Sequence, residues 1–368
     1  SSDGIWGRVE QGTTFTITQN TITDNSGNGI TVDSQKYPRN TADPTVTISG
    51  NTILNNSSIG IAINRDNSDY ITVSVSNNTI ANSGSEEIHI GSGTSKITVT
   101  QNRIHDGTGA GVTVRLTDSE VLSTKDIFQY NTITGTTTDG NIIYIDKGTP
   151  TISNNNIFQE STSYSVYAGS NVDSEITQIL ENNWWGTASD TEIQALIYDW
   201  NDDPTRKATD YTPFLTAPDT TAPPSPPANV ATQTGPTTIS LAWDANPESD
   251  IAGYKVYYDT DQSGYPYANS VDVGNVTSHT LSGLNTGTTY YTAVAAYDSG
   301  NDESWVSNQL TVVPQSVPTS LSYSVQPAGA TAGASFTNQP VIHIKDLDGA
   351  TVTSATNSVT LSITSGTG

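Results

Sequence analysis

Short apolar stretches separated by polar turns recur along the first part of the chain at a nearly regular interval. In each repeat an Asn has an apolar residue three positions before it and another two positions after it. These residues are Asn20, Asn51, Asn78, Asn102, Asn131, Asn155 and Asn182, at a mean spacing of 27 residues. A second apolar stretch follows in each repeat, and its apolar–polar alternation is typical of a strand with one buried face.

The repeat length restricts the fold. A propeller blade needs about 40 residues or more, and a leucine-rich repeat has a Leu signature that is absent here. A coil of three short strands fits, and successive coils would stack at the strand spacing of about 4.8 Å. The pattern therefore predicts an all-β fold that begins with a parallel β-helix. The recurring Asn is expected to form a ladder of stacked side-chain amides.

The segment after Asn182 predicts how the β-helix ends. Ser189 and Glu192 fit the S-x-x-E capping box of a helix N-terminus. The following apolar residues fall on one face of a short helix, at Ile193, Leu196, Ile197 and Trp200. We expect this helix to close the last coil as a C-terminal cap. Trp184, Trp185 and Trp200 are expected to pack within the cap, and a sugar-stacking platform is the alternative.

Several repeats contain the sequence NTI, and the first of them continues with the sequence GI and a Val two positions after the Ile. This pattern resembles the repeat of right-handed parallel β-helix proteins. This superfamily has the pectate-lyase-like fold and includes polygalacturonases, epimerases, phage tailspikes and many non-catalytic surface proteins. The resemblance covers residues 1 to about 215. The closing segment, with NNWWG and YDWNDD, is similar to that of secreted bacterial β-helix proteins. The resemblance implies a right-handed coil and an extracellular location, secreted or at the cell surface.

The pattern changes after the β-helix, which we assign to residues 1–217. Residues 218–228 are Pro-rich and predict a stiff linker. Residues 229–315 contain short alternating strands, and GLNTGTTYYTAVAA resembles the corner of a fibronectin type III β-sandwich with Tyr290 as the corner tyrosine. Its core is expected at Trp243, Tyr254, Val256 and Leu284.

Residues 316–368 resemble the start of a bacterial Ig-like domain and are too few for a complete one. Either downstream sequence or another chain would supply the missing strands. In both cases an open sheet edge invites contact with further strands.

Composition narrows the range of partners. The chain has 13 Lys+Arg against 37 Asp+Glu, a formal net charge of −24, and it has no Cys and no Met. Disulfides and thiolate metal sites are therefore excluded. Such an acidic surface disfavours nucleic acid and anionic membranes, which are bound through clustered cations. No apolar run reaches the length of a membrane-spanning helix, so the sequence predicts no membrane span.

The β-helix resemblance also gives a test for catalysis. The GHG, RIK and DPHE motifs of β-helix hydrolases and epimerases are absent, so no catalytic residue is assigned. If the chain is an enzyme, the candidates are His89, Arg115, Tyr144 and Asp146, which share one face when the strand register is regular. The alternative is an Arg115–Asp146 surface pair beside an exposed His.

One loop has the opening of a calcium site. Asp259 and Asp261 begin a D-x-D-x-x-G sequence but lack the further acidic ligands of a complete calcium loop. A plain turn is the alternative, and no other cofactor is expected.

These observations favour a non-catalytic extracellular surface protein, structural or adhesive. We expect it to self-associate as a subunit of a repeating surface layer or fibre. The alternative is a secreted protein that binds or degrades polysaccharide and carries accessory domains.

Overall fold

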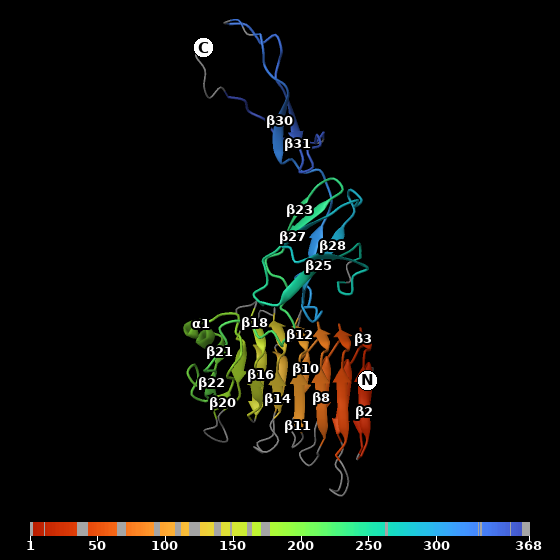
Figure 1. The fold of residues 1–368 in the computed structure, drawn as a ribbon, viewed down its shortest axis with the longest axis vertical. Helices are drawn as coiled ribbons and strands as arrows, with labels where there is room; N and C mark the ends of the chain where they lie inside the picture. The colour runs from red at the N-terminus through yellow and green to blue at the C-terminus, as the bar shows by residue number, and fades with distance from the viewer. Residues whose placement is uncertain are drawn as a thin grey trace. The chain divides into compact units, whose positions relative to one another are not determined.

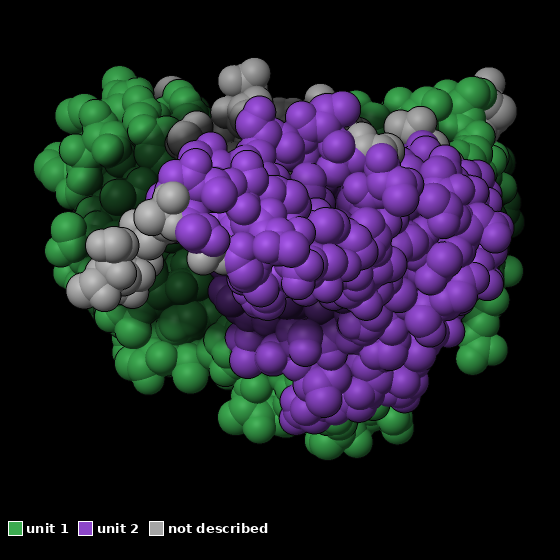
Figure 2. All heavy atoms as spheres, turned by 90° about the horizontal axis from the view of Figure 1, so that it is seen from above, with its two compact units in different colours: residues 1–226, 246–252, 296–305 green, residues 227–245, 253–295, 306–368 purple. Residues whose placement is uncertain are grey.

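The computed structural model describes residues 3–10, 12–34, 43–64, 71–91, 96–106, 112–117, 126–135, 141–147, 149–159, 164–170, 177–261, 264–329, 331, 333–353 and 355–362. The chain divides into two compact units, which Figure 2 shows in different colours. The first contains residues 1–226 together with segments 246–252 and 296–305. The second contains residues 227–245, 253–295 and 306–368.

The first unit is a parallel β-helix in which successive coils add strands to three sheets (Figure 1). The eight-stranded sheet A consists of β1 (Ile5–Val9), β4 (Ile30–Ser34), β7 (Ile61–Asn64), β10 (Ile88–Ile90), β13 (Val112–Thr117), β16 (Asn141–Lys147), β19 (Val166–Ala168) and β21 (Ile197–Tyr198). Sheet B consists of β2 (Thr14–Thr18), β5 (Thr45–Ser49), β8 (Thr72–Ser76), β11 (Lys96–Thr100), β14 (Ile127–Gln129) and β17 (Thr151–Ser153). Sheet C consists of β3 (Thr21–Thr23), β6 (Thr52–Leu54), β9 (Thr79–Ala81), β12 (Arg103–Asp106), β15 (Thr132–Gly135) and β18 (Asn156–Gln159).

Identical positions of successive coils stack in columns. Ile30, Ile61 and Ile88 are register partners across β4, β7 and β10, and each is fully buried. Similar apolar columns line sheets B and C, so one continuous core runs through all the coils. β-Branched Ile and Val fill these columns because they pack well on a pleated, buried surface. The predicted all-β fold and its β-helix are confirmed.

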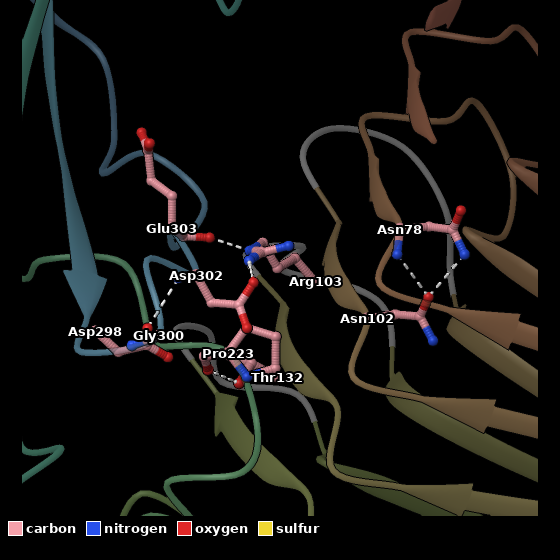
Figure 3. Close-up of polar contacts among 9 residues, drawn as sticks. All are labelled: Asn78, Asn102, Arg103, Thr132, Pro223, Asp298, Gly300, Asp302 and Glu303. Carbon is pink, nitrogen blue, oxygen red and sulfur yellow. Dashed lines mark hydrogen bonds and ion pairs between the residues drawn. The ribbon is translucent and has the colours of Figure 1, made fainter. Parts of the chain in front are cut away.

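The predicted Asn ladder lies at the corner between sheets B and C, called here the Asn corner. The Asn102 amide group donates to Asn131 Oδ1 at 2.9 Å and to the carbonyl oxygens of Val75 and Thr100. Its own Oδ1 accepts from the side chain of Asn78 at 2.9 Å (Figure 3). Each amide therefore bridges coils and replaces the hydrogen bonds that water would supply to a buried turn.

The prediction of Asn182 as the last rung is wrong by one residue. Asn155 donates to Asn183 Oδ1 at 3.0 Å, so Asn183 closes the ladder. Asn182 has φ 60°, the left-handed conformation that the residue before the ladder Asn adopts in the other coils as well. Asn tolerates both positions, so the pair Asn182-Asn183 is ambiguous in sequence. The shift buries Leu180 and leaves Ile179 39 % exposed.

The cap is shorter than its apolar pattern predicted. Helix α1 (Asp190–Ala195) begins at the N-cap Ser189, which accepts from Glu192 N, and buries Ile193. Ile197 belongs to β21 and pairs with β19. Nearby, β20 (Gln178–Ile179) pairs with β22 (Thr209–Asp210).

Two of the three tryptophans pack in the cap as expected. Trp184 and Trp185 are buried. Trp200 is 51 % exposed, so its placement on a buried helix face was wrong. The helix stops before Trp200 because the chain enters sheet A at Ile197.

The Pro-rich segment predicted as a linker lies against sheet C. Asp219 N donates to Asn156 Oδ1 at 2.8 Å, and Thr132 Oγ1 donates to the Pro223 carbonyl oxygen. Ser225 is buried, and its N–H donates to Glu248 in segment 246–252 at 2.8 Å. These contacts replace the water that would solvate a free linker.

The second unit contains most of a β-sandwich. One sheet is antiparallel and consists of β23 (Ala231–Thr234), β24 (Ile239–Ala242) and β27 (Ser278–Leu281). The other consists of β26 (Asn269–Gly274), β25 (Ile251–Asp259), β28 (Tyr290–Asp298) and β29 (Leu310–Val312). The predicted core residues are buried: Trp243, Tyr254, Val256 and Leu284. Tyr290 is buried as the corner tyrosine, and its hydroxyl accepts from Asn285 N at 3.1 Å.

The C-terminal part has two paired strands, β30 (Ser320–Val325) and β31 (Val341–Lys345), which run antiparallel. Leu321 and Tyr323 of β30 are 56 % and 48 % exposed. The Ig-like identity of residues 316–368 stays a prediction.

The first prediction concerns the ladder. We expect Asn102→Leu to destabilise the β-helix by about 1–3 kcal/mol, because neighbouring buried amides and carbonyls lose their partners. The matched control is Asn20→Leu at the exposed end of the ladder, which should cost clearly less. Thermal unfolding measures both. Equal melting temperatures for wild type and Asn102→Leu would contradict a stabilising ladder.

Candidate functional site

A single row of side chains, one from each coil, follows the outer positions of sheet A. Each member is the register partner of the next: Trp6, Thr31, Ala62, His89, Arg115, Tyr144, Tyr167 and Tyr198. We call this set the outer row. Its members alternate along their strands with core residues such as Ile88, Val114, Ile143 and Val166. Because neighbouring strands lie about 4.8 Å apart, adjacent members of the row can touch.

The structure brings three of the four predicted site residues together, in an order that differs from the expected one. A regular repeat of the apolar alternation aligns Arg115 with Asp146, but β13 is shifted by two residues, so that Arg115 pairs with His89 and with Tyr144. Val114 and Leu116 consequently point into the core. Asp146 lies two residues beyond Tyr144, at an irregularity in the β13–β16 pairing.

Arg115 is paired with Glu86, a residue that the sequence reasoning missed. Arg115 Nε donates to Glu86 Oε1 at 2.8 Å, and His89 Nδ1 lies 3.9 Å from the same oxygen. The guanidinium also lies over the Tyr144 ring, 4.8 Å from its centroid. The possible Arg115–Asp146 pair is thus replaced by an Arg115–Glu86 pair. Glu86 precedes β10 in a turn, and the alternation of the strand gave no signal for it.

The contacts of Glu86 keep it ionised. The interaction with His89 contributes most, and with hydrogen bonds from Ser85 and Arg115 it lowers the pKa of Glu86 from 4.5 to about 2, against the opposing effect of burial. A carboxyl group with this pKa is a poor general acid at neutral pH, because efficient acid–base groups have pKa values near the working pH. The cluster of Glu86, His89 and Arg115 therefore presents charged groups in fixed positions and hydrogen-bonding groups to a ligand.

Stacked tyrosines form the C-terminal end of the outer row. The Tyr144 and Tyr167 rings have centroids 5.6 Å apart, and those of Tyr167 and Tyr198 are 4.9 Å apart at an interplanar angle of 9°. Arg206 lies over Tyr167 at 4.5 Å, and its Nε lies 3.6 Å from Asp203 Oδ2. The ring faces are thus occupied by neighbouring rings and guanidinium groups. Ring edges and phenol hydroxyls remain for a ligand.

The predicted calcium loop lies in the second unit and is only partly described, since residues 262 and 263 fall outside the described residues. Asp259 accepts backbone N–H groups from Ala268 at 2.7 Å, Thr260 at 2.6 Å and Asp261 at 3.3 Å. The bond from Ala268 is the largest of the effects that lower the pKa of Asp259. In the described part of the chain, no three His, Asp or Glu side chains are grouped to hold a metal ion. Calcium binding here stays a prediction.

The comparisons with known families agree with this architecture. Residues 37–195 match the family described as right handed beta helix region, and residues 224–313 match the fibronectin type III domain. The chain thus carries a right-handed β-helix followed by a fibronectin type III domain. This combination is typical of extracellular proteins that act at surfaces or on polysaccharides. Within the described residues, no helix is both long and apolar enough to cross a bilayer.

Individual relatives cover parts of the chain. A Kelch domain-containing protein of Saccharolobus solfataricus is 38 % identical over 96 residues, which are 26 % of this chain and 12 % of that protein. The chain thus spans a small part of this curated relative. An Fn3-like protein from Clostridium thermocellum is 26 % identical over 27 % of this chain and 100 % of its own, with a TM-score of 0.23. The fn3 domain of human contactin 1 is 26 % identical over 28 % of this chain and 89 % of its own, with a TM-score of 0.24.

The second prediction concerns Glu86. The depressed pKa of Glu86 means that its stabilising effect is complete above about pH 4.5 and is lost as the pH falls towards 2. The shift corresponds to about 3 kcal/mol, which solvent screening reduces to about 1 kcal/mol at this partly exposed site. We therefore expect Glu86→Gln to lower stability by about 1 kcal/mol at pH 7 and by less than half as much at pH 3.

Thermal unfolding at the two pH values measures this difference. Glu10→Gln, at an exposed carboxyl group, is the control and should change little at either pH. A destabilisation by Glu86→Gln that is the same at pH 7 and pH 3 would refute the proposed role of the carboxylate.

Proposed function

We propose that this chain is part of a non-catalytic extracellular surface protein of the adhesive kind, whose β-helix binds an extended polysaccharide along the outer row. The observation that carries the proposal is the row itself. Arg115 and three stacked tyrosines lie on consecutive strands of sheet A, and their repeat follows the strand spacing. Arg206, from the segment after β21, lies over one of these rings. A linear polymer with regularly spaced hydroxyl groups matches such a one-dimensional array.

The chemistry of the row supports binding of hydroxyl-rich chains. Phenol hydroxyls both donate and accept hydrogen bonds, and guanidinium groups donate several. Stacking holds each ring in place, which reduces the entropy lost when a ligand orders the surface. The exposed ring of Trp200, two residues after Tyr198, offers one face for sugar stacking near the end of the row.

A degradative function is the second candidate, because His89, Arg115 and Tyr144 are adjacent on one face. The pairing of Arg115 with Glu86 and Tyr144 favours binding over this alternative. The arginine and the carboxylate already satisfy one another, and Glu86 stays ionised at neutral pH.

The third prediction tests binding. We expect Tyr167→Ala to weaken the affinity of the chain for its polysaccharide about tenfold, since truncating a ring in the middle of the row removes an aromatic contact of about 1.4 kcal/mol. Affinity electrophoresis in gels that contain pectate, polygalacturonate, alginate or neutral glucans measures this. The control is Tyr130→Asn, on a turn between sheets B and C with φ 56°, where Asn is well tolerated.

The same polysaccharides test the alternative. The chain should release no product from any of them, with or without Ca²⁺. Turnover that His89→Ala or Arg115→Ala abolishes would establish an enzyme. Retardation by no polysaccharide in the panel, or equal retardation of wild type and Tyr167→Ala, would reject the outer row as the binding face.

The fourth prediction concerns self-association. Exposed apolar side chains on the β30–β31 pair, including Leu321 and Tyr323, favour contacts with a further strand. We expect the chain to form oligomers, more extensively when millimolar Ca²⁺ offsets the net charge of −24. Mass photometry with and without Ca²⁺ measures this. Strictly monomeric particles in both conditions would rule out the layer or fibre.

A further inference from the structure

Besides the Pro-rich segment, sheet C contacts a second segment that comes from far along the chain. Residues 296–305 belong to the first unit together with the β-helix. They include the end of β28 and a tight turn, in which Gly300 N and Asp302 N both donate to Asp298 Oδ1 at 2.8 Å (Figure 3). We call residues 296–305 the docked segment. Because its turn is closed by its own hydrogen bonds, it meets sheet C as a preformed shape.

Arg103 of β12 holds the tip of this segment. Its Nη2 lies 3.0 Å from Asp302 Oδ1, and its Nε donates to the Glu303 carbonyl oxygen (Figure 3). The Arg103 side chain is 13 % exposed, whereas that of Asp302 is 50 % exposed. This ion pair is therefore screened by solvent and contributes modestly by itself.

His105, two residues along the same strand, makes the second contact. Its ring stacks on that of Trp305, with centroids 5.5 Å apart and an interplanar angle of 26°. Its Nδ1 lies 2.6 Å from Thr134 Oγ1 on the neighbouring strand β15. His105 is 9 % exposed, and Trp305 is 7 % exposed. Each of the two rings is thus buried while they are in contact.

The surroundings of His105 disfavour its cationic form. Its register partners on β9 and β15 are Ala81 and Thr134, which carry no charge. The charged residues on the elements packed around it are Arg103 and Asp106 on its own strand and Asp302 and Glu303 on the docked segment. The Asp302 carboxylate is engaged by Arg103. Burial lowers the pKa of His105 from 6.5 to about 4.

We infer that residues 296–305 form an acid-released latch, which stays docked on sheet C while His105 is neutral and is released when His105 takes up a proton. The sign follows from linkage. The pKa of His105 is lower in the docked state than in a solvent-exposed histidine, so the neutral form favours docking and the protonated form opposes it. Docking is therefore strongest above about pH 6.5 and weakens as the pH falls towards 4. At pH 5 the docking equilibrium is weaker than at pH 7.5 by roughly 30-fold, as these two pKa values require.

Titration of the full chain by NMR tests the contact. The protein has four histidines, and His105→Gln identifies the His105 ring signal by its loss. We expect this signal to titrate with a midpoint near 4 in the native protein and near 6.5 in Trp305→Ala. Trp200→Ala, which removes a ring exposed elsewhere, should leave the midpoint near 4. A native midpoint near 6.5 would overturn the inference.

Acrylamide quenching of tryptophan fluorescence tests the release itself. Trp305 is 7 % exposed while docked, so its quenching, taken as the difference between the native protein and Trp305→Phe, should rise as the pH falls through about 4. His105→Gln keeps a neutral polar side chain and should abolish this rise. Equal quenching of Trp305 in the native protein above and below this pH, or a rise that His105→Gln leaves unchanged, would refute the latch. Should Trp305→Ala fail to fold, Arg103→Gln provides a second variant; it removes one contact of the docked segment and should raise the His105 midpoint in the same direction by a smaller amount.

Discussion

The Asn corner fixes the geometry on which the rest of the β-helix depends. Two residues separate the sheet B strand from the sheet C strand in every coil: one in the left-handed conformation and one ladder Asn. The ladder amide donates to the coils on both sides and to its own turn, as Asn102 does towards Val75, Asn131 and Thr100. Because this corner has a constant length, each strand is in register with the corresponding strand of the preceding coil. The apolar columns follow from this registration, because a shift of one residue would turn core side chains outwards.

The same registration determines what the surface presents. His89, Arg115, Tyr144 and Tyr167 are adjacent only because sheet A repeats in register from β10 to β19. On sheet C it places Arg103 beside Thr132 and His105 beside Thr134, and these side chains hold segments from after the β-helix. The β-helix core thus supports two faces with different contacts: a half-buried aromatic row on sheet A and a face on sheet C that is covered by later segments of the chain.

Much of the fold could be predicted from the sequence, because the repeated Asn and the apolar alternation each report a strong constraint. The errors arose where local signals are degenerate. Asn182 and Asn183 are chemically equal, and only the left-handed backbone at Asn182 distinguishes them. In β13 the alternation fits Val112 and Val114 as well as Val114 and Leu116, so Arg115 was assigned to the wrong column.

Glu86 and the docking of segment 296–305 depend on tertiary contacts between turns, which have no periodicity. A second, shorter ladder was also missed: Asn25 donates to Asn56 Oδ1 at 2.8 Å.

The other two corners differ from the Asn corner in how their length varies. Five or six residues join sheet C to sheet A in each coil, whereas between 3 and 10 residues join a sheet A strand to the next sheet B strand. Most of the variation in repeat length is therefore concentrated at one edge of the coil, and the strands of sheets A and B on either side of it still pair in parallel from coil to coil. That edge is a natural place for evolutionary insertions and for the grafting of foreign peptides. Peptides inserted there in successive coils would be presented at intervals of one strand spacing, as a molecular ruler.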